Sequence, residues 1–375
     1  MKLKVERAIL LKALAHIQSV AEKRNTIPIL ANVLIVCGDN QLTLTATDME
    51  IAIVETIAAE ILEEGSVTAP ASVLYEIVRK LPENAMIELY HTSEDTPLSL
   101  RAGKYATSLN VISVEDFPSM TSDMFPHRFT LSAEILKKLI EQTRFAISTE
   151  ETRYYLNGIY IHIKQDDGGE SKLCAVATDG HRLARVESQV PEGASTIPGV
   201  IIPRKTIYEV YKLLEDSTET VEISLSETRI QFKLGKVTLT SKLIDGTFPE
   251  YERVIPKNNT KILRVDKQDF SMAVARVAAI SMERSRPVKL SLDNQSLIIS
   301  ASSADQGNAK EELDENQIHY DSGPLEIGFQ ARYLNDITDQ IDSQVEFIMA
   351  DNASPTIVRD VEDLSALYVL MPMRV

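Results

Sequence analysis

The chain repeats part of its own sequence, and this internal repeat limits the folds that it can adopt. The stretch LTATDMEIAIVE (44–55) resembles AVATDGHRLARVE (175–187). Their Thr-Asp pairs lie 131 positions apart, and the Phe-Pro pairs at 117–118 and 248–249 keep the same spacing. Two independent matches at one offset indicate a duplicated structural unit.

Amphipathic helices follow the same rhythm along the chain. Apolar residues that recur at steps of three and four predict two helices in each of three blocks. Ser132 and Asp266 are expected as N-caps, and Pro70 and Pro203 are expected in the first turn of two other helices. The six predicted helices cover 7–20, 70–82, 132–148, 203–215, 266–281 and 330–341. The third block shares the order of elements with the other two but little of their sequence.

The segments between these helices are typical of short β-strands. They alternate in polarity or run apolar, are rich in β-branched residues, and are separated by polar turns. Because the helices are too few for a doubly wound parallel sheet, we expect an α+β fold in which antiparallel sheets carry helices on one face. Proline-bearing polar stretches between the blocks predict domains over 1–122, 128–250 and 255–375.

The sequence carries no motif for catalysis or metal binding. Its six histidines form no HExxH and no cysteine–histidine cluster, and GxxxxGK[ST], GxGxxG after a strand, and GxSxG are all missing. We therefore predict no catalytic residue, no metal and no cofactor. An active site assembled from distant positions is left open by this search.

Three further features predict a cytoplasmic protein without a membrane partner. No apolar run reaches the ~18 residues of a spanning helix. The amphipathic N-terminal stretch lacks the apolar core and cleavage site of a signal peptide. Cys37 and Cys174 lie far apart in apolar runs, as expected of core residues in a reducing compartment.

Charge is distributed unevenly along the chain. The net charge of −16 taken alone argues against nucleic-acid binding. The six helical segments with their flanks sum to +7, however, which leaves −23 on the strands and loops. Any one helix could simply be a solvated face. Recurrence across a repeated unit favours a shared basic surface that binds phosphates without sequence preference.

Several stretches together resemble the bacterial DNA polymerase III beta subunits, the replicative sliding clamps. They are KRNTIPILANVLI, RYYLNGIYI (153–161), VATDGHRLA (176–184), VIIPRKTI (200–207), TSKLIDGTFPEYERVIPKN (240–258) and the C-terminal YVLMPMRV. The resemblance spans the whole chain. It implies three clamp domains in a crescent, with sheets outside and helices lining a central hole, and two crescents closing head to tail into a homodimeric ring.

The same resemblance implies partners and two kinds of site. The implied partners are double-stranded DNA, the alpha subunit of DNA polymerase III, the delta subunit of the clamp loader, and other polymerases and repair proteins that carry clamp-binding peptides. The implied role is that of a non-catalytic subunit of the holoenzyme, whose activity is DNA-directed DNA polymerase. The implied DNA-binding residues are Arg24, Arg79, Lys80, Tyr154, Tyr155, Arg204 and Lys205. The implied peptide-binding pocket comprises Arg153, Leu156, Thr178, Gly180, His181, Arg182, Leu183, Pro249, Arg253, Val254, Tyr333, Val369, Met371, Pro372, Met373 and Arg374.

The residue types suit these roles. Apolar side chains, methionine among them, make an adaptable pocket, and arginine or histidine at its rim can hold a peptide's backbone or acidic groups. Tyrosines suit single-strand base stacking. Four positions depart from the pattern of the resembled family: Pro355, Gln330, Ser285 and, at the expected dimer joint, Thr107.

The Asp179–Arg182 stretch has an alternative interpretation as an enzyme's catalytic turn. The first repeat keeps the Thr-Asp pair but has Met49-Glu50 in place of Gly180-His181. The Thr-Asp pair is therefore predicted to be structural, and Gly-His-Arg to be special to the middle block. Because nucleophile and metal partners are missing, a peptide pocket is favoured. A protein-only scaffold of clamp shape and a clamp paralogue are the remaining alternatives.

Overall fold

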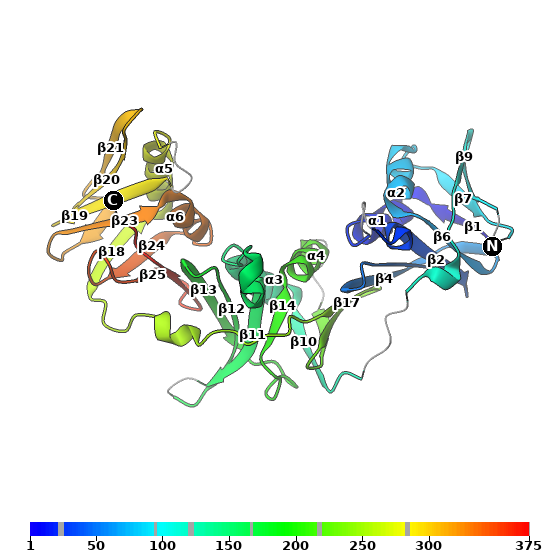
Figure 1. Cartoon of the computed structure of the whole chain (residues 1–375), viewed down its shortest axis with the longest axis horizontal. Helices are drawn as coiled ribbons and strands as arrows, with labels where there is room; N and C mark the ends of the chain where they lie inside the picture. Colours follow the sequence, from blue (N-terminus) through cyan, green and yellow to red (C-terminus); the bar gives the residue numbers. More distant parts are fainter. Residues whose placement is uncertain are drawn as a thin grey trace. The chain divides into compact units, whose positions relative to one another are not determined.

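A computed structural model describes residues 1–21, 26–93, 96–118, 124–165, 168–215, 220–281 and 286–374 (Figure 1). These residues form an α+β fold in which every paired strand is antiparallel, as predicted. The α-helices are α1 (Arg7–Ile17), α2 (Ala71–Lys80), α3 (Ala133–Arg144), α4 (Arg204–Glu215), α5 (Lys267–Ala278) and α6 (Ala331–Thr338). Short 3₁₀ helices are η1 (Pro28–Ala31), η2 (Val114–Asp116), η3 (Glu151–Leu156) and η4 (Tyr251–Val254).

All six predicted helices are present, although most are shorter than expected at their C-terminal ends. The two predicted N-caps are confirmed. Ser132 Oγ accepts a hydrogen bond from the Ile135 N–H at 3.2 Å, and Asp266 Oδ1 accepts one from the Asp269 N–H at 3.0 Å. The expectation for the prolines is wrong by one position. Pro70 is the N-cap of α2, and Pro203 ends the strand before α4, because these helices start directly from strands.

The chain divides into two compact units. Unit 1 comprises Met1–Lys137, Pro191–Pro198 and Lys205–Leu243, and unit 2 comprises Lys138–Val190, Gly199–Arg204 and Ile244–Val375. The division passes through the middle repeat, so that each unit holds one outer repeat and part of the middle one. The boundaries of the three repeats therefore remain a prediction.

Unit 1 contains two sheets, with strand orders β5-β1-β7-β8-β9 and β10-β15-β16-β17-β4-β3-β2-β6. Their strands are β1 (Lys2–Glu6), β2 (Asn32–Gly38), β3 (Gln41–Thr47), β4 (Ile51–Ala58), β5 (Glu60–Glu63), β6 (Gly65–Pro70), β7 (Met86–Tyr90), β8 (Leu98–Ala102), β9 (Tyr105–Leu109), β10 (His127–Ser132), β15 (Thr220–Leu225), β16 (Arg229–Leu234) and β17 (Val237–Lys242). α1 packs against α2 within this unit (Figure 1). The pairing of β4 with β17 joins the first repeat to the middle one.

Unit 2 also contains two sheets, with strand orders β14-β11-β12-β13-β26-β25-β24-β18-β22 and β21-β20-β19-β23. Their strands are β11 (Gly158–Gln165), β12 (Ser171–Thr178), β13 (Arg182–Gln189), β14 (Val200–Pro203), β18 (Lys261–Asp266), β19 (Pro287–Asp293), β20 (Ser296–Ser303), β21 (Gly307–Leu313), β22 (Ile318–Tyr320), β23 (Leu325–Gln330), β24 (Gln344–Met349), β25 (Thr356–Asp360) and β26 (Ala366–Leu370). α5 packs against α6 (Figure 1). The pairing of β13 with β26 joins the middle repeat to the third.

The structure also bears on the cysteines, on metal binding and on membrane-spanning helices. Cys37 and Cys174 are both free and buried, as expected of core residues. In the described part of the chain, no three His, Cys, Asp or Glu side chains are grouped so that they could hold a metal ion. Among the same residues, none of the helices has the length and apolar character needed to cross a membrane.

Candidate functional site

The Thr178-Asp179 pair forms a hydrogen-bonded turn between β12 and β13. The Thr178 hydroxyl donates to the Arg182 carbonyl at 2.7 Å and accepts from the Gly180 N–H at 3.1 Å. Asp179 Oδ1 accepts from the N–H groups of His181 and Arg182 at 2.9 and 3.0 Å. The short side chains thus satisfy backbone groups of the turn.

The first repeat makes the same turn with the same bonds. The Thr47 hydroxyl donates to the Ile51 carbonyl at 2.9 Å and accepts from the Met49 N–H at 3.0 Å. Asp48 Oδ1 accepts from the Glu50 and Ile51 N–H groups at 2.8 and 2.7 Å. The prediction that the Thr-Asp pair is a shared structural frame is confirmed.

Gly180 combines a left-handed backbone with the close approach of a neighbouring side chain. Its φ is +88°, in the region that favours glycine, although the equivalent Met49 adopts a φ of 74° with a full side chain. A Cβ at position 180 would lie 2.5 Å from Arg153 Nη1, so the end of that side chain would have to move. Glu150 holds that guanidinium from the other side, with Oε2 2.7 Å from Arg153 Nε, and this bond raises the pKa of Arg153. The glycine therefore makes room for an arginine at the mouth of the turn.

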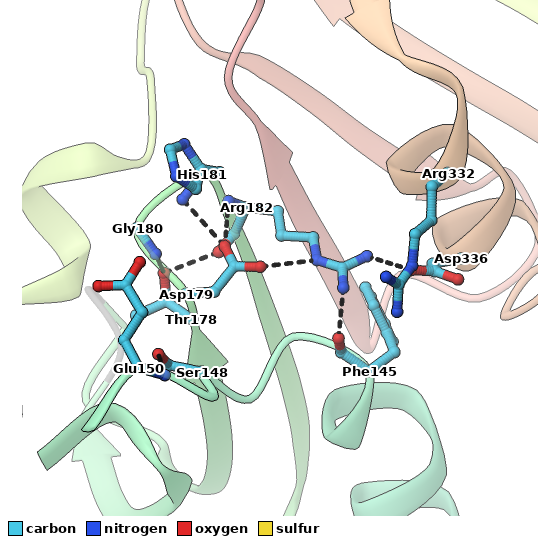
Figure 2. Close-up of polar contacts among 10 residues, drawn as sticks. All are labelled: Phe145, Ser148, Glu150, Thr178, Asp179, Gly180, His181, Arg182, Arg332 and Asp336. Atoms are coloured by element: carbon cyan, nitrogen blue, oxygen red, sulfur yellow. Dashed lines mark hydrogen bonds and ion pairs between the residues drawn. The ribbon is translucent and has the colours of Figure 1, made fainter. Parts of the chain in front are cut away.

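Arg182 is buried and fully engaged with the protein around it (Figure 2). Its Nε donates to Asp179 Oδ2 at 3.1 Å and its Nη1 to Asp336 Oδ2 at 2.5 Å. Its Nη2 donates to the Phe145 carbonyl at 2.6 Å. The guanidinium also lies over the rings of Tyr333 and Phe145, at 4.3 and 5.1 Å from their centroids. The rim position expected for the pocket's arginines therefore does not describe Arg182.

His181 is exposed and stacks near an aromatic ring of the third repeat. Its ring centroid lies 6.3 Å from that of Tyr333, with 25° between the ring planes. Burial raises the pKa of Tyr333, and the nearby Asp179 carboxylate adds to this effect. The pair places one predicted pocket residue from α6 beside one from the turn.

A buried apolar cluster lies beneath the turn in unit 2. Its members are Leu156, Cys174, Val176, Leu183, Ile201, Phe248, Tyr251 and Val369. Burial raises the pKa of the Cys174 thiol to about 12, so this cysteine stays protonated at neutral pH. Three predicted pocket residues, Leu156, Leu183 and Val369, are thereby brought together. Pro249 and Val254 flank cluster members along the chain and are exposed.

The C-terminal tail is docked rather than free. Val369 on β26 pairs with Leu183 on β13. Beyond the strand, the Met371 N–H donates to the His181 carbonyl at 3.0 Å, and the Met373 N–H donates to the Gly328 carbonyl at 2.8 Å. The backbone of the tail is thus held at two points, Met371 at the turn and Met373 at β23. Met371 still exposes 42% of its surface.

The remaining pocket positions are less closely tied to this centre. Arg253 is exposed and pairs with Glu250 one turn away. The Pro355 carbonyl accepts a hydrogen bond from Asn259 Nδ2 at 2.9 Å. Gln330 ends β23 at the N-cap of α6. Ser285 lies outside the described residues.

The predicted DNA-binding residues are divided between the units and several already have partners. Arg24 lies outside the described residues. In unit 1, Arg79 and Lys80 are exposed at the end of α2 and both pair with Glu76, while Lys205 pairs with Asp48. In unit 2, Arg204 and Tyr154 are exposed. Tyr155, by contrast, packs against the apolar cluster.

Sequence reasoning missed three residues of the site: Phe145, Glu150 and Asp336. Phe145 contributes a carbonyl and a ring face, neither of which has a sequence signature. Asp336 lies 154 positions from its partner Arg182. Only the fold brings Phe145 and Asp336 to Arg182, whereas Glu150 lies three residues before Arg153, a spacing that suits an ion pair within one turn.

Comparison with known proteins agrees with this geometry along the whole chain. Family models for the DNA polymerase III beta subunit match residues 1–121 (N-terminal domain), 130–250 (central domain) and 252–374 (C-terminal domain), in accord with three repeated domains. The beta sliding clamp of Caulobacter vibrioides is 51% identical, with 100% of each chain covered.

Solved structures give the same result for the fold. A crystal structure of the C. crescentus beta sliding clamp with PEG superposes with a TM-score of 0.97 at 51% identity, covering 100% of this chain and 99% of that one. A sliding clamp from Bartonella birtlesii bound to griselimycin gives 0.96 at 47% identity, with 100% of both chains covered.

Proposed function

The chain belongs to the family of DNA polymerase III beta subunits, the beta sliding clamps, and on this premise we propose how its residues divide the work of a clamp. It is a non-catalytic processivity factor of DNA replication. Membership implies association with DNA and with a polymerase. The partners that occupy the site in unit 2, the ring and its contacts with DNA are parts of the proposal, as is action in the cytoplasm.

In this proposal, the pocket of unit 2 receives short linear peptides. Its apolar side would come from Leu156, Leu183, Val254, Val369 and Met371, and its polar rim from Arg153 and His181. The observation that carries the assignment is the docked tail, whose Met371 N–H donates to the His181 carbonyl at 3.0 Å. A rigid floor with exposed methionine and valine at its edge suits peptides that differ in sequence. Such peptides would come from the alpha subunit of DNA polymerase III, the delta subunit of the clamp loader, and other polymerases and repair proteins.

The proposed homodimer uses two sheet edges that pair with no further strand among the described residues of their own units. β9 is the edge of the five-stranded sheet of unit 1, and β21 is the edge of the four-stranded sheet of unit 2. A groove beside β9 is lined by Val73, Ile77 and Tyr105, and Val73 and Tyr105 are exposed by 46% and 43%. Unpaired edges favour strand addition, so β9 of one copy is proposed to meet β21 of the other. Tyr105, two residues from Thr107 on the same face of the strand, would supply an aromatic side chain at the joint.

Two such joints would close a ring around duplex DNA. Binding is then topological, and modest attraction between basic helix residues and phosphates suffices. Arg24, Arg79, Lys80, Arg204 and Lys205 are proposed for this attraction, and Tyr154 and Tyr155 for contact with single-stranded template. The exposed Tyr154 and Arg204 suit their roles better than Tyr155 and Lys205, which are occupied by contacts within the protein.

Loading on circular DNA tests the ring. The protein is loaded onto nicked circular DNA by a clamp loader, and the DNA is then linearised by a restriction enzyme. Retention on the circle with loss from the linear form is the expected result, because a ring slides off free ends. Equal retention on both forms would overturn the ring, since it would indicate ordinary surface binding.

A further inference from the structure

We propose that Asp336 is a positioning residue of the peptide pocket, acting through Arg182 to hold α6 and the Thr178–Arg182 turn in register. The inference rests on the proposed function of the pocket. Asp336 lies outside the set of residues that the sequence resemblance implied for peptide binding, and it acts on the two walls between which a peptide would lie.

Arg182 has few donors left for a peptide. Its side chain is 5% exposed. Each of its three nitrogens donates within the protein, to Asp179, Asp336 and the Phe145 carbonyl (Figure 2). The guanidinium also lies over the rings of Tyr333 and Phe145. A buried cation with this many internal partners fixes the protein around it and is poorly placed to bind a ligand.

The partners of Arg182 lie on two different walls of the proposed pocket. Asp179 begins the turn that presents Gly180 and His181, whose carbonyl also anchors the tail. Asp336 lies on α6 three residues after Tyr333, and residues at that spacing share a helix face. Tyr333 stacks near His181 at 6.3 Å. Arg182 therefore ties the element that carries Tyr333 to the element that carries His181, and Asp336 is the only carboxylate that α6 contributes to Arg182 among the described contacts.

Unit 2 holds a second ion pair between the middle and third repeats that does not link the turn to Tyr333. Lys138 on α3 pairs with Asp363 of the third repeat at 2.7 Å, with side chains 43% and 36% exposed. This pair also joins the middle and third repeats, but neither residue contacts the turn or Tyr333 in any described interaction. Exposed pairs of this kind contribute little to stability. Lys138→Gln is therefore a control for loss of one ion pair between these repeats.

The test measures the affinity of a fluorescently labelled clamp-binding peptide from the alpha subunit of DNA polymerase III by anisotropy. Asp336→Asn is expected to weaken binding roughly 10-fold, because the buried guanidinium loses a charged partner and α6 shifts. Asp336→Glu should recover most of the loss, and Lys138→Gln should stay within about two-fold of the parent chain. The dimer is checked by light scattering in every case.

A double-mutant cycle separates positioning from general damage to the fold. If Asp336 acts through Arg182, Asp336→Asn should add less than about two-fold in an Arg182→Met background. Additive losses in the two backgrounds would overturn the proposal, and so would unchanged peptide affinity in Asp336→Asn. If that variant fails to fold, Asp336→Glu in the same cycle gives the coupling. Failure of the parent chain to bind the peptide would instead overturn the proposed pocket, and the role of Asp336 with it.

Discussion

The two Thr-Asp turns have one backbone and two different surroundings. In both, the threonine hydroxyl and one aspartate oxygen make the same four hydrogen bonds. In both, the fourth residue of the turn offers its carbonyl to a neighbouring segment: Glu50 accepts from the Lys242 N–H at 2.9 Å, and His181 accepts from the Met371 N–H at 3.0 Å. A duplicated turn thus docks a strand end at each joint between repeats.

The second aspartate oxygen shows how the joints diverged. In unit 1, Asp48 Oδ2 accepts directly from Lys205 on α4. In unit 2, Asp179 Oδ2 accepts from Arg182, and Arg182 also donates to Asp336 on α6. Arg182 stands at the position of the apolar Ile51 of the first repeat. In unit 2 a buried guanidinium therefore donates to the second aspartate oxygen, whereas in unit 1 an exposed lysine does so. Three residues differ around an unchanged frame: Gly180, His181 and Arg182 stand where the first repeat has Met49, Glu50 and Ile51.

The largest expected difference between the joints concerns the tail. At the first joint the segment bonded to the turn is the end of β17, whereas at the second it is the stretch after β26 that carries Met371 and Met373. Deleting residues 371–375 should therefore weaken peptide binding by about 100-fold or more, because the proposed pocket loses one of its walls. The dimer should persist, since β9 and β21 are untouched. Anisotropy and light scattering measure the two, and unchanged affinity would refute the pocket.

Removing the cation at each joint should lower the free energy of unfolding by different amounts. Arg182→Met leaves Asp179 and Asp336 without their buried partner and should cost about 3 kcal/mol of unfolding free energy. Lys205→Met removes a 41% exposed lysine from the buried Asp48 carboxylate, whose Oδ1 keeps its two N–H donors, and should cost about 1–2 kcal/mol. Denaturant unfolding measures both. Similar losses would mean that the two joints are energetically equivalent and that burial does not separate them.

Substitutions at Gly180 and Met49, the two turn residues with positive φ, test why the turns differ in sequence. Gly180→Ala should displace Arg153 and weaken peptide binding by roughly 5-fold, since a Cβ would meet its Nη1 at 2.5 Å. Met49→Gly at the equivalent position should change the unfolding free energy by less than about 1 kcal/mol and leave peptide affinity unchanged. An alanine at 180 that binds peptide normally would show that Arg153 moves without consequence.

The smallest contrast is expected where the turns are the same. Thr47→Val and Thr178→Val each remove a buried hydroxyl that makes two bonds within its turn. Each should lower the unfolding free energy by about 1–2 kcal/mol, with the two values equal within about 0.5 kcal/mol. Thermal melts of both variants check this. A clearly larger effect at 178 would mean that the frame itself had been recruited for binding.

Local sequence patterns predicted much of this fold. The six helices follow from apolar spacing, and the Ser132 and Asp266 caps follow from side chains that reach the next three residues. The placement of Pro70 and Pro203 failed by one position because strands run directly into helices there. The role of Lys205 could not be read locally either, because its partner Asp48 belongs to another repeat and lies 157 positions away.

The sequence by itself determined the turn, because each bond of the Thr-Asp frame joins residues within four positions of one another. It also marked Gly180-His181-Arg182 as special, because the repeat offered an internal comparison. The tertiary structure alone decided what Arg182 does. Pairing of β13 with β26 brings α6 and the tail to the turn, and only then does Asp336 neutralise the buried guanidinium. Contacts between distant segments depend on strand register, which no local spacing encodes.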